Sequence, residues 1–87
     1  MDERTHQSAT LELEFTIEPF VASQPGPHVL AAHDACTAAG LELEPGPFGS
    51  RASGPSEQVL GVLETLIRAS LSEGGSRISM QIRRPNP

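Results

Sequence analysis

The chain has 87 residues, a length that suits one small domain. Its 11 acidic residues outnumber its 6 basic ones, all of which are arginines, and the formal net charge is −5. This charge argues against nucleic acid and anionic membrane surfaces as partners, because both are bound largely through lysine and arginine. The only aromatic residues are three phenylalanines. A core this poor in rings, at this length, favours assembly into oligomers.

Cysteine content and hydropathy exclude further classes of protein. The single cysteine, Cys36, excludes an intrachain disulfide and an iron–sulfur cluster held by one chain. No stretch approaches the ~18 consecutive apolar residues of a membrane span. The first ten residues are polar and lack the apolar segment of a secretory signal. We therefore expect a cytoplasmic protein that has no membrane partner.

The first half of the chain predicts a strand and a helix. Apolar and polar residues alternate strictly over 10–18, which is typical of a strand with one buried face, and Pro19 ends the pattern. Prolines and a glycine over 21–27 predict a loop. An alanine-rich helix is expected over 28–39, with Gly40 just beyond its end. Its core-facing stripe is expected to contain Val29, Leu30, His33, Cys36 and Thr37.

The second half predicts three more main elements and one weaker strand. They are a short alternating strand over 41–44, a weak strand over 48–53, an amphipathic helix between Ser56 and Gly74, and an alternating strand over 78–83. Ser56 is the expected N-cap of the helix, because its hydroxyl can accept from an unpaired helical N–H. The core-facing residues expected in this helix are Val59, Leu60, Leu63, Leu66, Ile67, Ser70 and Leu71.

The order βαββαβ predicts an α+β fold. With right-handed crossovers, it folds most simply into the ferredoxin-like arrangement, a four-stranded antiparallel sheet in the order 4-1-3-2 with two helices on one face. Residues 10–84 would form this single domain. Residues 1–9 would be a flexible N-terminus, and 85–87 a C-terminal tail.

This topology pairs the first and last strands, so their outward polar residues face each other. An approximate register places Glu12 near Arg83, Glu14 near Gln81 and Thr16 near Ser79. One interpretation is a solvated face with a single cross-strand ion pair. The other is an oligomer interface or a ligand surface, in which Thr16 and Ser79 are secondary candidates for ligand contact.

One end of the sheet gathers the loop after the first strand, the bend between the second and third, and the turn before the last. The main ligand-binding candidates there are Glu18, Phe20, Phe48, Gly49 and Ser50. Two phenylalanines with a carboxylate and hydroxyls nearby could bind a flat, hydrogen-bonding, cationic ring. The alternative is that Phe20 and Phe48 only cap the core.

The sequence offers little for catalysis or metal binding. His28 and His33 are five residues apart and do not share a helix face. His33 and Cys36 could share one, but two ligands do not complete a metal site. We interpret His33 as a packed helix residue and Cys36 as a small buried hydrophobe, without the base that would activate its thiol. We expect no enzymatic activity, no metal and no cofactor.

Three stretches together are similar to a known family. They are EFTIEPF (14–20), LELEPGPFGSRASG (41–54) and EGGSRISMQIRR (73–84). Their order and spacing resemble the small thiamine-binding protein family, the YkoF-like group of ferredoxin-like proteins. The likeness runs from about Thr10 to Arg84. Two departures are Glu18, where members often have a tyrosine or another apolar residue, and 53–55, where they commonly have an acidic segment.

The resemblance implies binding of thiamine or its hydroxymethylpyrimidine part, without catalysis, in a homodimer or homotetramer. Some relatives carry two such repeats, and a second copy of this single-repeat chain would supply the missing half. An aminopyrimidine offers a donor beside acceptors, and an acidic protein suits a thiazolium cation. The alternative is an interaction module that binds another protein through the open sheet face or an edge strand, with no small ligand.

Overall fold

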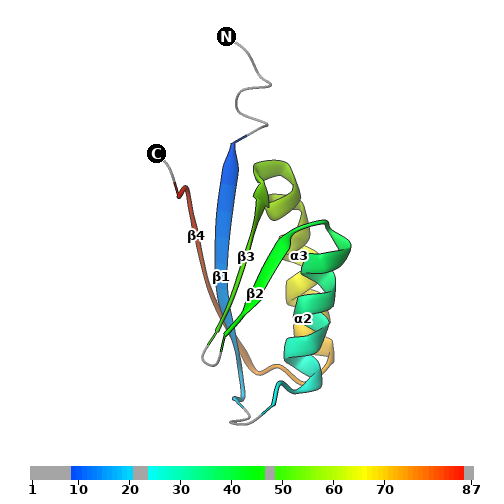
Figure 1. Cartoon of the computed structure of the whole chain (residues 1–87). Coiled ribbons are helices and arrows are strands. Elements are labelled where there is room, and N and C mark those ends of the chain that lie inside the picture. The colour runs from blue at the N-terminus through cyan, green and yellow to red at the C-terminus, as the bar shows by residue number, and fades with distance from the viewer. Residues whose placement is uncertain (1–8, 21–23, 47–48, 86–87) are drawn as a thin grey trace.

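A four-stranded antiparallel sheet carries both helices on one face in the computed structural model of the chain, which describes residues 9–20, 24–46 and 49–85 (Figure 1). In chain order the elements are β1 (Thr10–Glu18), α2 (Pro27–Ala38), β2 (Glu42–Pro45), β3 (Ser50–Pro55), α3 (Ser56–Ser72) and β4 (Arg77–Arg83). The strand order is β2-β3-β1-β4. The predicted ferredoxin-like fold and strand order are confirmed. Within the described residues, neither helix is long and apolar enough to cross a membrane.

Strand β1 lies between β3 and β4 and separates two chemically different faces. Its residues Leu13, Phe15 and Ile17 are buried under the helices. The alternate residues point to the face without helices, which we call the outer face. The predicted register between β1 and β4 is confirmed, because Glu12 is opposite Arg83, Glu14 opposite Gln81 and Thr16 opposite Ser79.

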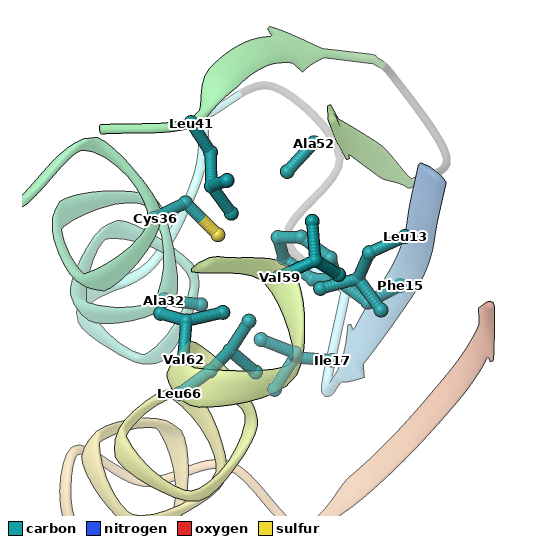
Figure 2. Close-up of a cluster of buried hydrophobic side chains, with 10 residues drawn as sticks. All are labelled: Leu13, Phe15, Ile17, Ala32, Cys36, Leu41, Ala52, Val59, Val62 and Leu66. Carbon is teal, nitrogen blue, oxygen red and sulfur yellow. The ribbon is translucent and has the colours of Figure 1, made fainter. Parts of the chain in front are cut away.

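The core fills the space between the sheet and the two helices. Figure 2 shows the β1 side chains pointing toward side chains of both helices. The ten buried hydrophobic residues are Leu13, Phe15, Ile17, Ala32, Cys36, Leu41, Ala52, Val59, Val62 and Leu66. Phe15 is the only aromatic ring among them, so aliphatic burial, at about 1.5–3 kcal/mol for each large side chain, supplies most of the stabilisation.

Helix α2 is rotated relative to the stripe predicted from the sequence. It buries His28, Ala32 and Cys36, which are spaced by four residues, whereas Leu30 is 48% exposed and Thr37 is exposed. The small side chains of Ala32 and Cys36 allow the helix to lie close against its neighbours. Of the predicted stripe, Cys36 is buried as expected and Val29 packs partly buried against the core, so the prediction was wrong at Leu30 and Thr37. It favoured the larger apolar residues and therefore missed Ala32.

The start of α3 and the bounds of β3 also differ from the prediction. The third strand covers Ser50–Pro55 rather than 48–53, because its ladder with β1 starts at the pair Phe15–Ser50 and continues to Thr10–Pro55. The chain passes directly from this strand into α3. Pro55 is therefore at the N-cap and Ser56 is the first helical residue, so the predicted N-cap was wrong by one position.

The buried side of α3 agrees only in part with the predicted face. Val59, Leu66 and Ser70 are buried as expected, and the predicted Leu63 packs partly buried against the core. Val62, which was not predicted, is buried with them. Three predicted core residues are instead exposed, namely Leu60, Ile67 and Leu71. Since the buried positions 59, 62, 66 and 70 follow one helical stripe, the exposed three lie on its flank.

The core predicts a sharp contrast between two leucine variants. Leu13→Ala removes a fully buried side chain beside α3, so we expect it to lower the free energy of unfolding by about 2–5 kcal/mol. Leu60→Ala, at an exposed position, should change it by less than about 1 kcal/mol. Urea unfolding followed by circular dichroism measures both. Equal losses for the two variants would contradict the core described above.

Candidate functional site

Two cavities lie at the end of the sheet where β1 ends and β3 begins. The outer cavity, of about 470 Å³, is on the outer face and includes Glu14, Glu44, Arg51, Ser79 and Gln81. The inner cavity, of about 290 Å³, is on the helix side and includes Ile17, Phe20, Gln24, Val29 and His33. Both are also lined by Phe15, Thr16, Pro45, Gly46, Gly49 and Ser50. The two cavities therefore share a wall made by β1 and the ends of β2 and β3.

Glycine is required at the two positions that bring this wall together. A Cβ on Gly49 would lie 2.8 Å from Thr16 Cγ2 and 3.3 Å from the carbonyl oxygen of Phe15. A Cβ on Gly46 would lie 2.6 Å from the carbonyl oxygen of Gly49. The distances of 2.8 and 2.6 Å are shorter than real Cβ atoms essentially ever show, and 3.3 Å is tighter than most. The two glycines thus let Gly46 lie close to Gly49, and Gly49 lie close to Phe15 and Thr16 of β1.

Arg51 organises the charges of the outer cavity. Its Nη2 donates to Glu14 Oε2 at 3.1 Å, while its other guanidinium nitrogens lie 3.8 Å from Glu12 Oε2 and Glu44 Oε1. Arg83 Nε donates to the second oxygen of Glu12 at 2.6 Å. Exposed ion pairs of this kind contribute little stability. They do fix two carboxylates, those of Glu14 and Glu44, beside a single arginine, which leaves the lining acidic and suited to a cation.

A hydrogen bond between α2 and β3 supplies the polar centre of the inner cavity. His33 Nε2 and Ser50 Oγ are 2.7 Å apart, and Ser50 is 8% exposed. The His33 ring also meets Phe15 edge-on, with the ring centroids 6.2 Å apart. Burial lowers the pKa of His33 below its ordinary value, against a smaller opposing effect of Asp34. The imidazole is therefore neutral at pH 7.

The start of α2 is tied to the end of β1 by a second histidine. His28 is buried, and its Nε2 donates to the carbonyl oxygen of Pro19 at 2.7 Å. Pro19 follows a cis peptide bond to Glu18. A Cβ on Gly26 would lie 2.7 Å from the His28 ring, so this position has no room for a side chain. The contact holds the segment that leads into α2 near the inner cavity.

The structure brings most of the predicted site residues to these cavities. Thr16, Gly49 and Ser50 line both of them, Ser79 lines the outer one and Phe20 lines the inner one. Phe20 is 55% exposed, so the alternative in which it caps the core does not describe it.

Glu18 and Phe48 stand apart from this group. Glu18 lines neither cavity. Its Oε2 lies 3.6 Å from Arg77 Nε, and its carbonyl oxygen accepts hydrogen bonds from the backbone N–H and the hydroxyl of Ser76. These contacts close the ladder between β1 and β4. Phe48 lies outside the described residues.

Sequence reasoning missed His33 as a cavity residue, and it missed the central position of Arg51. His33 was correctly expected to pack within a helix, but its partner is 17 residues away on β3. No local spacing reveals such a pair. The signal for Arg51 was present, because its alternation with Ser50 and Ala52 places it on the outer face among the glutamates.

The described part of the chain offers little for nucleophilic catalysis or for metal binding. It contains no group of three or more His, Cys, Asp or Glu residues that could hold a metal ion. Cys36 is buried, and burial raises the pKa of its thiol to about 11. The thiol is therefore protonated at neutral pH, which makes it a poor nucleophile.

Several solved structures share this fold. One is a domain of unknown function, DUF77, from Bacillus cereus (TM-score 0.62, 18% identity, 87% of this chain and 74% of that one). A second is a hypothetical protein from Methanocaldococcus jannaschii (TM-score 0.65, 16% identity, 91% and 84%). A third, from Thermotoga maritima, is named a "putative thiamine biosynthesis/salvage protein" (TM-score 0.60, 19% identity, 85% and 80%). No protein-family model and no curated protein matches the chain. At these identities the likeness shows the fold alone.

The lowered pKa of His33 predicts a specific pH dependence of stability. The ordinary pKa of histidine is 6.5. Below that pH, His33 binds a proton more readily in the unfolded chain than in the folded chain. The free energy of unfolding should therefore fall as the pH drops from 7 toward 5. His33→Gln, which keeps a polar atom near the Nε2 position but does not titrate, should flatten this part of the profile.

Urea unfolding of both proteins at half-unit pH intervals measures the effect. Because both proteins have the same carboxylates, the contribution of carboxylate titration cancels when the two profiles are compared. If the two profiles run parallel between pH 5 and 7, the assigned burial of His33 is wrong.

Proposed function

We propose that the protein is a non-catalytic small-molecule-binding protein of the thiamine-binding family, and that it binds thiamine or its hydroxymethylpyrimidine moiety. The observation that carries the proposal is the pair of cavities that share Thr16, Gly49 and Ser50. One cavity is acidic and polar, and the other is mostly apolar with a partly buried hydroxyl–imidazole pair. The name of the Thermotoga maritima structure adds support through its shared fold.

The chemistry of the outer cavity suits the charged part of such a ligand. Thiamine carries a permanent positive charge on its thiazolium ring, and the carboxylates of Glu14 and Glu44 are near enough to attract it. Thr16, Ser79 and Gln81 add hydroxyl and amide groups that can donate or accept hydrogen bonds. A phosphate-rich ligand would be disfavoured, because the only basic residue among the described lining is Arg51, which already contacts three glutamates.

The proposed contact residues are Thr16, Glu18, Phe20, Phe48, Gly49, Ser50 and Ser79. Five of them line a cavity, whereas Glu18 and Phe48 remain predictions from the sequence. Glu18 could reach a ligand only by giving up its contact with Arg77.

A second copy of the chain is part of the proposal. The outer cavity opens on a sheet face that no helix or strand of the described residues covers (Figure 1). A homodimer or homotetramer would cover that face and place the ligand at or near the interface between copies. The small aliphatic core of the single domain also favours assembly. We propose a cytoplasmic location, in keeping with the single cysteine, which cannot form an intrachain disulfide.

One observation favours a second candidate, a protein–protein interaction module. Strand β4 is a seven-residue edge strand, and Ile82 on its helix side is 41% exposed. An uncovered edge of this length can add a strand from another chain. In that case binding would not need either cavity.

Calorimetry with thiamine tests the main proposal. We expect saturable binding that weakens about two- to fivefold in Glu44→Gln, because one carboxylate beside the cation is lost. Glu42→Gln is the matched control, since it is also an exposed glutamate of β2 but lines neither cavity. Its affinity should equal that of the unmodified protein.

Two results would count against the proposal. Absence of heat at millimolar thiamine and millimolar hydroxymethylpyrimidine, with folded protein, would favour the interaction module. Equal weakening by both glutamine variants would mean that the cation is attracted by the whole acidic face and not by the outer cavity.

A further inference from the structure

The inner cavity places the Ser50–His33 pair, together with the polar side chains of Thr16 and Gln24, in mostly apolar surroundings. Its apolar lining includes Phe15, Ile17, Phe20 and Val29. Among the described residues that line it, His33 is the only one that titrates. A cavity of about 290 Å³ with this lining suits a small flat ring rather than an extended or charged molecule.

The Ser50 hydroxyl is positioned by the strand that carries it and by one hydrogen bond to α2. Its residue is 8% exposed at the start of β3, opposite Phe15 on β1, and its Oγ is 2.7 Å from His33 Nε2 on α2. When the imidazole is neutral with Nε2 unprotonated, the hydroxyl donates its proton to this nitrogen. The oxygen then keeps its lone pairs for an N–H donor on a ligand.

Protonation of His33 would reverse this arrangement. The imidazolium can only donate from Nε2, so Ser50 Oγ would accept from His33 and turn its own proton toward the cavity. A ring that presents an N–H group would then meet a donor in place of an acceptor. It would also lie beside the positive charge of the imidazolium.

Among the groups around His33, the imidazole itself is the one whose protonation would control ligand binding in the inner cavity. Within α2, Asp34 follows it, His28 binds Pro19, and Cys36 keeps its proton at neutral pH. From the sheet, the side chains that face it are Phe15 and Ser50, which do not titrate. The β1 and β2 glutamates belong to the outer face, and the buried residues of α3 carry no charge.

We propose that the inner cavity binds the flat, uncharged amino-bearing ring of the ligand, with Ser50 Oγ accepting from an N–H of that ring and neutral His33 orienting the hydroxyl. This inference rests on the proposed function and assigns the pyrimidine part of the ligand to one side of the shared wall. His33 is a positioning residue, because it acts through Ser50. The acidic outer cavity is left for groups that carry positive charge.

The first arm of the test measures hydroxymethylpyrimidine binding by calorimetry at pH 8. Ser50→Ala should weaken binding about five- to tenfold, since it removes one hydrogen bond from a buried site. Ser53→Ala, on the outward side of the same strand and outside both cavities, is the matched control and should leave the affinity unchanged. Circular dichroism checks that both variants are folded.

The second arm separates positioning from structural support. Lowering the pH from 8 to 5.5 should weaken binding more in the unmodified protein than in His33→Gln, because the glutamine does not titrate. The ring's own protonation affects both proteins equally and cancels in the comparison. In NMR titrations of the unmodified protein, saturating ligand should lower the pKa of His33 further.

The outcomes distinguish this inference from the function on which it rests. Binding that Ser50→Ala does not weaken, or a pH dependence that His33→Gln does not alter, would overturn the inference while thiamine binding still stood. No binding of hydroxymethylpyrimidine or thiamine to the unmodified protein would overturn both.

Discussion

Strand β1 imposes the constraint on which the rest of the structure depends. It lies between β3 and β4, and its alternation assigns Leu13, Phe15 and Ile17 to the core and their neighbours to the outer face. A slip of one residue would exchange these two sets and expose the core residues. The same register places Thr16 opposite Ser79 at the outer cavity. Core packing and site geometry are therefore set by one ladder.

The hydrogen bond between His33 and Ser50 connects this sheet to α2 at the point where the two cavities meet. The rotation of α2 that buries Ala32 and Cys36 also brings His33 over the start of β3. Gly49, just before β3, then lies close against Phe15 and Thr16 of β1. The result is a thin wall with an acidic polar side and an apolar side. A ligand that joins a cation to a neutral aminated ring matches the two kinds of lining.

The fold was predictable because its signals are local and mutually consistent. Strict alternation marked β1 and β4, and the element order then left one simple topology, which also gave the register of Glu12 with Arg83. The rotation of α2 was not predictable, since an alanine-rich helix shows little contrast between its sides. Ser56 was misplaced because β3 continues directly into α3. The cavity lining was predictable at Thr16, Gly49, Ser50 and Ser79, which strands and turns position, and not at His33, whose partner is distant in sequence.

The central claim is that a thiamine-like ligand binds at the wall shared by the two cavities. An amide NMR titration of the full chain with thiamine tests it most directly, because every described backbone N–H reports on its surroundings. The account predicts that the largest shifts fall on Thr16, Gly49, Ser50 and Ser79, while α3 residues such as Leu60 and Leu71 do not move. Shifts confined to the β4 edge or to α3, or no shifts at saturating thiamine, would contradict it.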